Sequence, residues 1–247
     1  MITELHTFDY NGKKLSELGA VIRQRPTYAI AVHDIKFESI PFLSGDVAID
    51  NKKYKNITYK IPIRAVPSLC NLSAEDFAKK LSEWLDTGEY GVYRDTYNKG
   101  YFRYAIVTNI DPVVAVYKDV FESSITFSLK PFLYADSGTK ALTKASASNA
   151  VNMQLINPEQ WDSEPIIKIN GSGNFTVAVG NISITLTGVN NYIVIDKTKE
   201  DVYDGNGSCN DKLSGLYLPY LKKGVNNISI TGDGSFTVDI TPNWRRL

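Results

Sequence analysis

Two glycine-rich phrases, GSGNFTVAV from Gly171 and GDGSFTVDI from Gly232, are the stretches whose spacing comes nearest to a site for chemistry. A G-x-G turn holds a dinucleotide phosphate when a third glycine stands at the sixth position and a helix follows. Here the sixth residues are Thr176 and Thr237, and each phrase continues with period-two alternation, which predicts a strand. We therefore expect two hairpin turns in which glycine supplies a positive φ, and no cofactor.

The histidines and cysteines show no catalytic or metal-binding spacing. His6 and His33 lie in strand-like contexts without any recognised protease or hydrolase motif around them. Cys70 and Cys209 are 139 positions apart, so no Cys-x-x-Cys pair exists. The sequence predicts structural imidazoles, two free thiols and no transition-metal site.

Acidic residues offer two further candidates for chemistry. Asp204, Asn206 and Ser208 alternate as in a calcium loop, but Cys209 and Gly215 stand where that loop needs glycine and glutamate. A solvated surface loop is the favoured interpretation. A glycosidase needs two carboxylates at a defined separation in space, which sequence spacing does not give. Asp111, Asp119 and Glu122 could form such a pair, and surface charge is the simpler expectation for each.

Tyrosine is abundant, with 15 copies, and two clusters of rings could stack on sugars. One is DTYNKGYFRYAIV, from Asp95 to Val107; the other is GLYLPYL, which holds Tyr217 and Tyr220. Core or interface positions are the commoner use of such rings. Tyr217 and Tyr220 are retained as candidate glycan contacts.

Composition excludes several classes of function. The chain has 247 residues, with 27 basic and 27 acidic side chains, so it lacks the charge of a general nucleic-acid binder. The amino terminus lacks the basic and apolar regions of a signal peptide, and no apolar run reaches the length of about 18 residues that a membrane helix needs. We expect a soluble protein that is made in a cytoplasm and does not insert into a membrane.

The elements that would position these residues are strands, with a single confident helix. LSAEDFAKKLSEWLDTGEY carries an N-cap at Ser73 with Asp76 as its reciprocal capping partner. It also has an apolar stripe that includes Trp84, and a glycine, Gly88, suited to end the helix. The segments ITYKIPIRAV, RYAIVTNI and ESSITFSLK predict strands, and Asn11-Gly12 predicts a tight hairpin.

A change of texture divides the chain. Residues 135–150 are small, polar and aperiodic, as in a connector, and short strands with glycine and asparagine turns follow. We predict a mixed domain over residues 1–140 and a β-sandwich over residues 141–247. Because the second block has its own apolar set, we expect residues from about 150 to 247 to fold alone.

The order of these phrases resembles the distal tail (Dit) proteins of long-tailed bacteriophages. HTFDYNGKKLSELGAVI, EWLDTGEY and ITFSLKPFLY carry the resemblance in the first block, and EPIIKINGSGNFTVAV, YIVIDKTKEDVYD and the segment from YLPYLKKG to the carboxyl end carry it in the second. One departure is IPFLSGDVAID, where a glycine-rich step is expected and only Gly45 is present, so the early hairpin of the first block is expected to differ in shape from that of the family. No inserted carbohydrate-binding domain is evident.

The resemblance implies a mainly β protein with one helix (α+β). A β-barrel-like block with a packed helix would precede a galectin-like β-sandwich. It further implies a non-enzymatic hub at the tail tip of the virion. Six copies would form a ring that joins the tail tube to the baseplate, with the tape-measure, tail-associated and receptor-binding proteins as partners.

A closed ring of identical subunits needs a heterologous interface. The pattern YKNITYKIPI suggests one buried face, and we predict that Tyr54, Tyr59, Ile61 and Ile63 contribute to the ring contact. Two other functions stay open from sequence: a carbohydrate-binding or host-adhesion module, and a glycan-cleaving enzyme.

Overall fold

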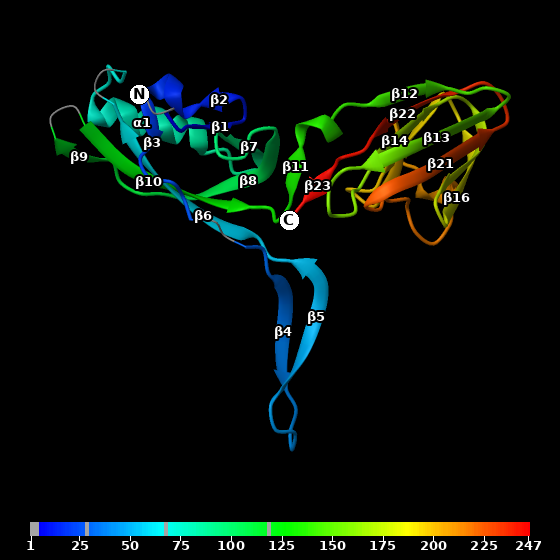
Figure 1. The fold of residues 1–247 in the computed structure, drawn as a ribbon, viewed down its shortest axis with the longest axis horizontal. Coiled ribbons are helices and arrows are strands. Elements are labelled where there is room, and N and C mark those ends of the chain that lie inside the picture. The colour runs from blue at the N-terminus through cyan, green and yellow to red at the C-terminus, as the bar shows by residue number, and fades with distance from the viewer. Residues whose placement is uncertain (1–4, 28–29, 67–68, 118–119) are drawn as a thin grey trace. The chain divides into compact units, whose positions relative to one another are not determined.

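The computed structural model describes residues 5–27, 30–66, 69–117 and 120–247, and the chain divides into two compact units (Figure 1). Unit 1 comprises residues 1–133 together with Leu247, and unit 2 comprises residues 134–246. The connector that the sequence predicts is a folded part of unit 2. Residues 142–145 form a strand that pairs along its length with another near the carboxyl end, so the expectation of an aperiodic linker is wrong there.

Unit 1 is built from one helix, one short 3-10 turn and strands. In chain order they are β1 (Phe8–Tyr10), β2 (Lys13–Lys14), η1 (Leu15–Leu18), β3 (Ala20–Ile22), β4 (His33–Ser39), β5 (Asp46–Tyr54), β6 (Ile57–Ala65), α1 (Ala74–Leu85), β7 (Gly91–Asp95), β8 (Tyr101–Ile110), β9 (Val114–Tyr117) and β10 (Val120–Leu129).

One sheet organises this unit, with strand order β2-β1-β7-β8-β10-β6-β3 and β9 on one end of β10. Asn11 and Gly12 connect β1 to β2 with φ of 54° and 79°, the left-handed pair that a two-residue hairpin requires. The predicted strands at 57–66, 103–110 and 122–130 correspond to β6, β8 and β10. The predicted class, mainly β with one helix, is confirmed.

Helix α1 covers the core of unit 1. Its stripe of Phe77, Leu81, Trp84 and Leu85 is buried, as the spacing predicts. Ser73 caps the helix by accepting a hydrogen bond from the Asp76 amide at 3.1 Å.

Two details of the helix ends differ from the sequence prediction. Asp76 does not reach back to the Ser73 amide; its carboxylate instead accepts a bond from the Ser73 hydroxyl at 2.7 Å. The helix ends at Leu85, with Asp86 as the capping residue. Gly88 has a φ of +66° and therefore turns the chain after the helix, without capping it.

Unit 2 continues with strands and two further 3-10 turns. They are β11 (Leu133–Ala135), η2 (Asp136–Gly138), β12 (Leu142–Ala145), β13 (Ala150–Asn157), β14 (Ile166–Asn170), β15 (Gly173–Val179), β16 (Ile182–Val189), β17 (Tyr192–Asp196), β18 (Asp201–Asp204), β19 (Gly207–Ser208), η3 (Asn210–Lys212), β20 (Leu213–Ser214), β21 (Gly224–Gly232), β22 (Thr237–Thr241) and β23 (Arg245–Arg246).

Two sheets form the predicted sandwich. One has the order β12-β22-β14-β17-β18-β19, and the other has the order β13-β21-β15-β16-β20. Alternate residues of both sheets point into a shared apolar core, with Ile169, Val177, Ile193, Ile230 and Val238 at 0% exposure. Strands β11 and β23, which belong to neither of these two sheets, pair with each other and tie the start of this unit to its end.

The two glycine-rich phrases are not hairpins. Strand β14 belongs to the six-stranded sheet, and β15, which follows Gly171 and Ser172, belongs to the five-stranded sheet. The second phrase returns the chain from β21 to β22 in the same way. Each phrase is thus an arch between the sheets, and a strand, not a helix, follows it. The hairpin prediction was wrong because strand–turn–strand does not state which strands pair.

The two arches pack against each other, which explains their glycines. Phe175 lies opposite Gly232 across the sheet, and a Cβ on Gly232 would lie 2.6 Å from that ring. A Cβ on Gly171 would lie 2.8 Å from the Cβ of Phe236, and the two phenylalanine rings meet edge to face at 5.2 Å. Only Gly173, with φ of +116°, needs the left-handed region. Close packing, and not a positive φ, therefore requires glycine at Gly171 and Gly232.

Candidate functional site: an exposed hairpin arm

The most unusual surface of unit 1 is the hairpin of β4 and β5, which we call the arm. These strands pair only with each other, from His33 opposite Tyr54 to Ser39 opposite Asp46. Figure 1 shows the ribbon leaving the main sheet of unit 1. A two-stranded ribbon has no third strand or helix to cover it and is at best marginally stable alone. The arm is therefore a candidate contact surface.

Both faces of the arm carry exposed apolar side chains. Phe37 lies on one face, on the side of Ala48, and is 64% exposed. Ile49 lies on the other face, opposite Lys36, and is 40% exposed. Exposed large apolar residues continue through the arm and its flanks: Ile30, Val32, Ile35, Ile40, Phe42, Leu43 and Val47. Contiguous apolar surface of this kind marks a protein contact.

Polar interactions hold the base of the arm. Lys53 and Lys55 lie 3.3 and 3.6 Å from the Asp34 carboxylate, which also accepts a bond from Asn51 at 3.1 Å. The Asn51 bond, aided by the lysines, lowers the pKa of Asp34. The His33 imidazole is 3.5 Å from Asp50. Charged side chains also lie farther along the arm, where Lys36 and Glu38 form an ion pair beside the exposed apolar residues.

The tip of the arm has an uncommon backbone. Phe42 is fully exposed and has a φ of +67°, a left-handed conformation that bulky residues rarely adopt. Gly45, with φ of +90°, completes the turn. The glycine-rich step that the family resemblance leads one to expect is thus replaced by one glycine and a strained phenylalanine. Strain of this kind clusters at functional segments.

The predicted ring residues have different positions. Ile61 and Ile63 are 0% exposed within the core of unit 1, so they cannot touch another chain, and that part of the prediction is wrong. Tyr59 packs half-buried at 6.1 Å from Tyr93, and burial raises its pKa. Tyr54 stands at the base of the arm, 4.4 Å from the His33 ring. The contribution of Tyr54 and Tyr59 to a ring contact stays a prediction.

The family resemblance implied a hairpin at IPFLSGDVAID but not its exposure as an arm, although a signal for that exposure was present. The segment IKFESIPFLSGDVAI has apolar residues on both sides of a turn, and it has no third segment with which it must pair. Alternation alone does not distinguish a strand inside a sheet from an unsupported one.

The predicted acid residues and histidines lie in ion pairs and ring contacts. Asp111 is 2.8 Å from Lys60, and that bond lowers its pKa. Arg64 bonds Glu122 at 2.6 Å, Arg23 bonds it from the other side, and these contacts lower the pKa of Glu122. The general acid of a glycosidase needs a raised pKa, whereas the pKa of both Asp111 and Glu122 is lowered. Asp119 lies outside the described residues.

His6 stacks on Tyr97 at 4.2 Å, and its Nδ1 is 3.1 Å from the Thr96 hydroxyl. Both cysteines are free and buried. Burial raises the pKa of the Cys209 thiol. Tyr217 is 71% exposed, whereas Tyr220 is half-buried with Lys222 Nζ 5.9 Å from its ring.

Asp204 and Asn206 make a simple turn between β18 and β19, in which the Asn206 amide donates to Asp204 at 2.7 Å. Over the part of the chain that the structure describes, no group of three or more histidine, cysteine or acidic side chains could hold a metal ion. In the same part, no helix has the length and apolar character to cross a membrane.

Comparison with known proteins identifies the fold. No protein-family model matches the chain, and no curated protein matches it either. Among solved structures, the chain is similar to the Dit protein of phage SPP1, described as a paradigm of the hub adsorption apparatus in phages that infect Gram-positive bacteria. The TM-score is 0.69 at 13% identity, over 99% of this chain and 100% of that one. The chain has the Dit fold.

Two structures of the phage P2 baseplate in its activated conformation are also similar. The one with calcium has a TM-score of 0.52 at 9% identity, and the one with strontium has a TM-score of 0.51 at 10% identity. Each match covers 96% of this chain and 97% of the other chain. The Dit fold therefore extends over both units of the chain, as the order of sequence phrases predicts.

Proposed function

We propose that this protein is the hub of a phage tail tip. Six copies close into a ring that joins the tail tube to the baseplate and to tail-associated or receptor-binding proteins, with the tape-measure protein as a further neighbour. The role is structural and non-catalytic, and its place is the tail tip of the virion. Similarity along the whole chain to a hub protein and to baseplate proteins supports this proposal.

The observation that carries the proposal is the exposed arm. In a ring, the arm of one copy lies against the next copy, and the same contact repeats until the ring closes. Such a contact would cover Phe37 on one face and Ile49 on the other. This contact would explain why the arm of a monomer exposes so much apolar surface to water.

Mass in solution tests the ring. One copy has a mass of 27.5 kDa, so a hexamer has a mass of about 165 kDa, which light scattering or native mass spectrometry resolves. We expect the double variant Phe37→Ser/Ile49→Ser to remain a monomer because it removes apolar surface from both faces of the arm. Lys36→Ser/Lys52→Ser, which changes exposed polar residues of the same ribbon, is the matched control and should assemble as the parent does.

A parent that is monomeric at every concentration and shows no rings by negative-stain microscopy, even with tail partners added, would refute the hub proposal. Assembly of the Phe37→Ser/Ile49→Ser variant at parental strength would show that the arm is not the ring contact.

The alternative, a carbohydrate-binding or host-adhesion module, has one specific observation in its favour, a groove on unit 2 that is lined in part by neutral amide side chains.

A further inference from the structure

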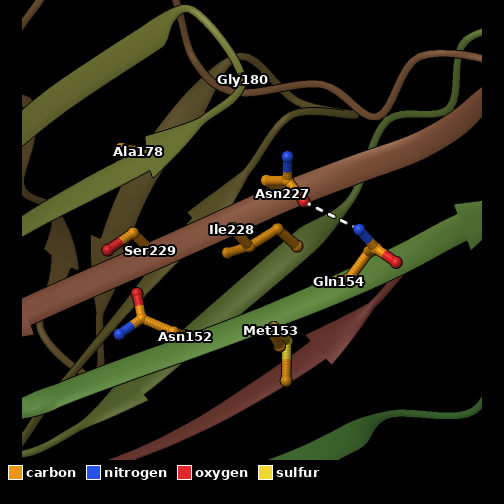
Figure 2. Close-up of a pocket in the computed structure, with 8 residues that line it drawn as sticks. All are labelled: Asn152, Met153, Gln154, Ala178, Gly180, Asn227, Ile228 and Ser229. Carbon is orange, nitrogen blue, oxygen red and sulfur yellow. Dashed lines mark hydrogen bonds between the residues drawn. The ribbon is translucent and has the colours of Figure 1, made fainter.

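A groove of about 460 Å³ lies on the outer face of the five-stranded sheet of unit 2. Figure 2 shows its residues on three adjacent strands, β13, β21 and β15, and on the turn that follows β15. The lining residues are Asn152, Met153, Gln154, Ala178, Gly180, Asn227, Ile228 and Ser229. The volume lies in the range of about 300–1,000 Å³ that is usual for small-ligand sites.

The hollow follows from the sizes of neighbouring side chains. Long amides stand on β13 and β21, where Gln154 lies opposite Asn227. On the next strand, Ala178 lies opposite Ser229, and Gly180 follows at the turn. A Cβ on Gly180 would meet nothing within 4 Å, so this side of the groove is open. Small residues beside long ones thus leave a trough along the sheet.

The groove offers neutral hydrogen-bonding groups. Gln154 donates through Nε2 to Asn227 Oδ1 at 3.0 Å, which fixes both amides across the strands (Figure 2). That bond leaves Gln154 Oε1 as an acceptor and Asn227 Nδ2 as a donor. The side chains of Asn152 and Ser229 likewise make no hydrogen bond within the described chain and add both kinds of group. No lining residue carries a charge.

Apolar surface adjoins these amides on the same face. Ile156 lies opposite Val225, two residues along each strand from the Gln154–Asn227 pair. Because strand residues two apart share a face, this pair extends the groove wall. The two side chains are 63% and 58% exposed.

We propose that this groove binds a neutral saccharide chain. Vicinal hydroxyls both donate and accept hydrogen bonds, which matches the amide groups of Gln154, Asn227 and Asn152. The C–H face of a sugar ring matches the apolar pair beside them. Lys144 Nζ donates to the Asn152 carbonyl at 2.5 Å beside the groove, but no lining residue carries a charge that could pair with an anionic ligand. An oily ligand would leave the amides unsatisfied. The site is separate from Tyr217 and Tyr220, and it does not depend on ring formation.

Ligand-observed NMR with the full-length protein tests the proposal. The probes are maltotriose, lactose and triacetylchitotriose, set against sulphated and uronic-acid-containing oligosaccharides. We expect saturable binding of at least one neutral probe and none of the charged ones. Gln154→Ala and Asn227→Ala should each weaken binding by about tenfold, since each removes one polar group and frees its partner.

Ala178→Leu fills the trough with a residue that a strand tolerates, so binding should be lost while the melting curve is kept. Thr185→Ala changes an exposed residue of β16 on the same sheet, outside the groove, and should bind as the parent does. The proposal is overturned if no neutral probe binds at millimolar concentration, if charged probes bind equally well, or if Ala178→Leu binds as the parent does.

Discussion

Trp84 anchors helix α1 to the sheet of unit 1, and its removal should unfold that unit. The side chain is 7% exposed and stacks on Phe8 with ring centroids 5.5 Å apart. Its Nε1 donates to the Tyr10 carbonyl at 3.0 Å, in a buried position. Truncation of such a residue to alanine costs about 3–5 kcal/mol in lost transfer energy and cavity. The orphaned carbonyl places the cost at the upper end of that range.

This loss is large beside the roughly 5–15 kcal/mol that stabilises a domain. At roughly 2–8 °C per kcal/mol, the melting temperature of unit 1 should fall by about 10 °C or more. Trp84→Phe keeps an aromatic ring near Phe8 but loses the N–H donor, so its cost should be about 1–3 kcal/mol. The comparison separates the hydrogen bond from the packing.

Calorimetry with near-ultraviolet circular dichroism measures both variants. We expect Trp84→Ala to lower the transition of unit 1 and to prevent ring assembly, while the transition of unit 2 is kept. Tyr217→Ala is the control, because a side chain that is 71% exposed should change stability by no more than about 0.5 kcal/mol. If Trp84→Ala melts as the parent does, the assignment of this residue as a core anchor is refuted.

Three further predictions concern both units. Gly232→Ala should destabilise unit 2 by about 1–3 kcal/mol in a denaturant titration, whereas Gly234→Ala, whose added Cβ meets nothing within 4 Å, should not. A fragment of residues 134–247 should unfold cooperatively on its own. A fragment that starts at residue 150 lacks β11 and β12, so it should have a lower melting temperature. Equal melting temperatures of the two fragments would contradict a stabilising role of these strands. Arg64 and Arg23 lower the pKa of Glu122 in the folded state below its unfolded value of about 4.5. The ionised carboxylate therefore stabilises unit 1 above that pH, and this stabilisation is lost as the pH falls below it. Glu122→Gln should make the melting temperature of unit 1 depend less on pH between about pH 5 and 3.

The helix and the first hairpin could be predicted because their signals are local. Ser73 and the apolar stripe through Trp84 act within a few turns of one helix, and Asn11-Gly12 defines a turn by its own backbone preferences. The arches could not be predicted, since Gly171 and Gly232 are explained by rings that lie about sixty residues away in the chain. A local pattern carries no information on that partner.

Burial, like strand pairing, could be predicted from the sequence only in part. The alternation around Ile61 correctly indicated a buried face, but a face buried in the core and a face buried between subunits have the same pattern. Only the fold shows that Ile61 is inside the core while Phe37, with a similar pattern around it, is exposed on the arm.

The sequence by itself determined the mainly β class, the capped helix and the order of phrases that resembles the Dit proteins, because periodicity, capping and turn preferences act over a few residues. Tertiary structure alone decided which strands pair, which apolar residues remain in water, and that Gln154, Ala178 and Asn227 meet along one groove. Those properties depend on contacts between segments far apart in the chain, and such contacts exist only once the sheets have formed.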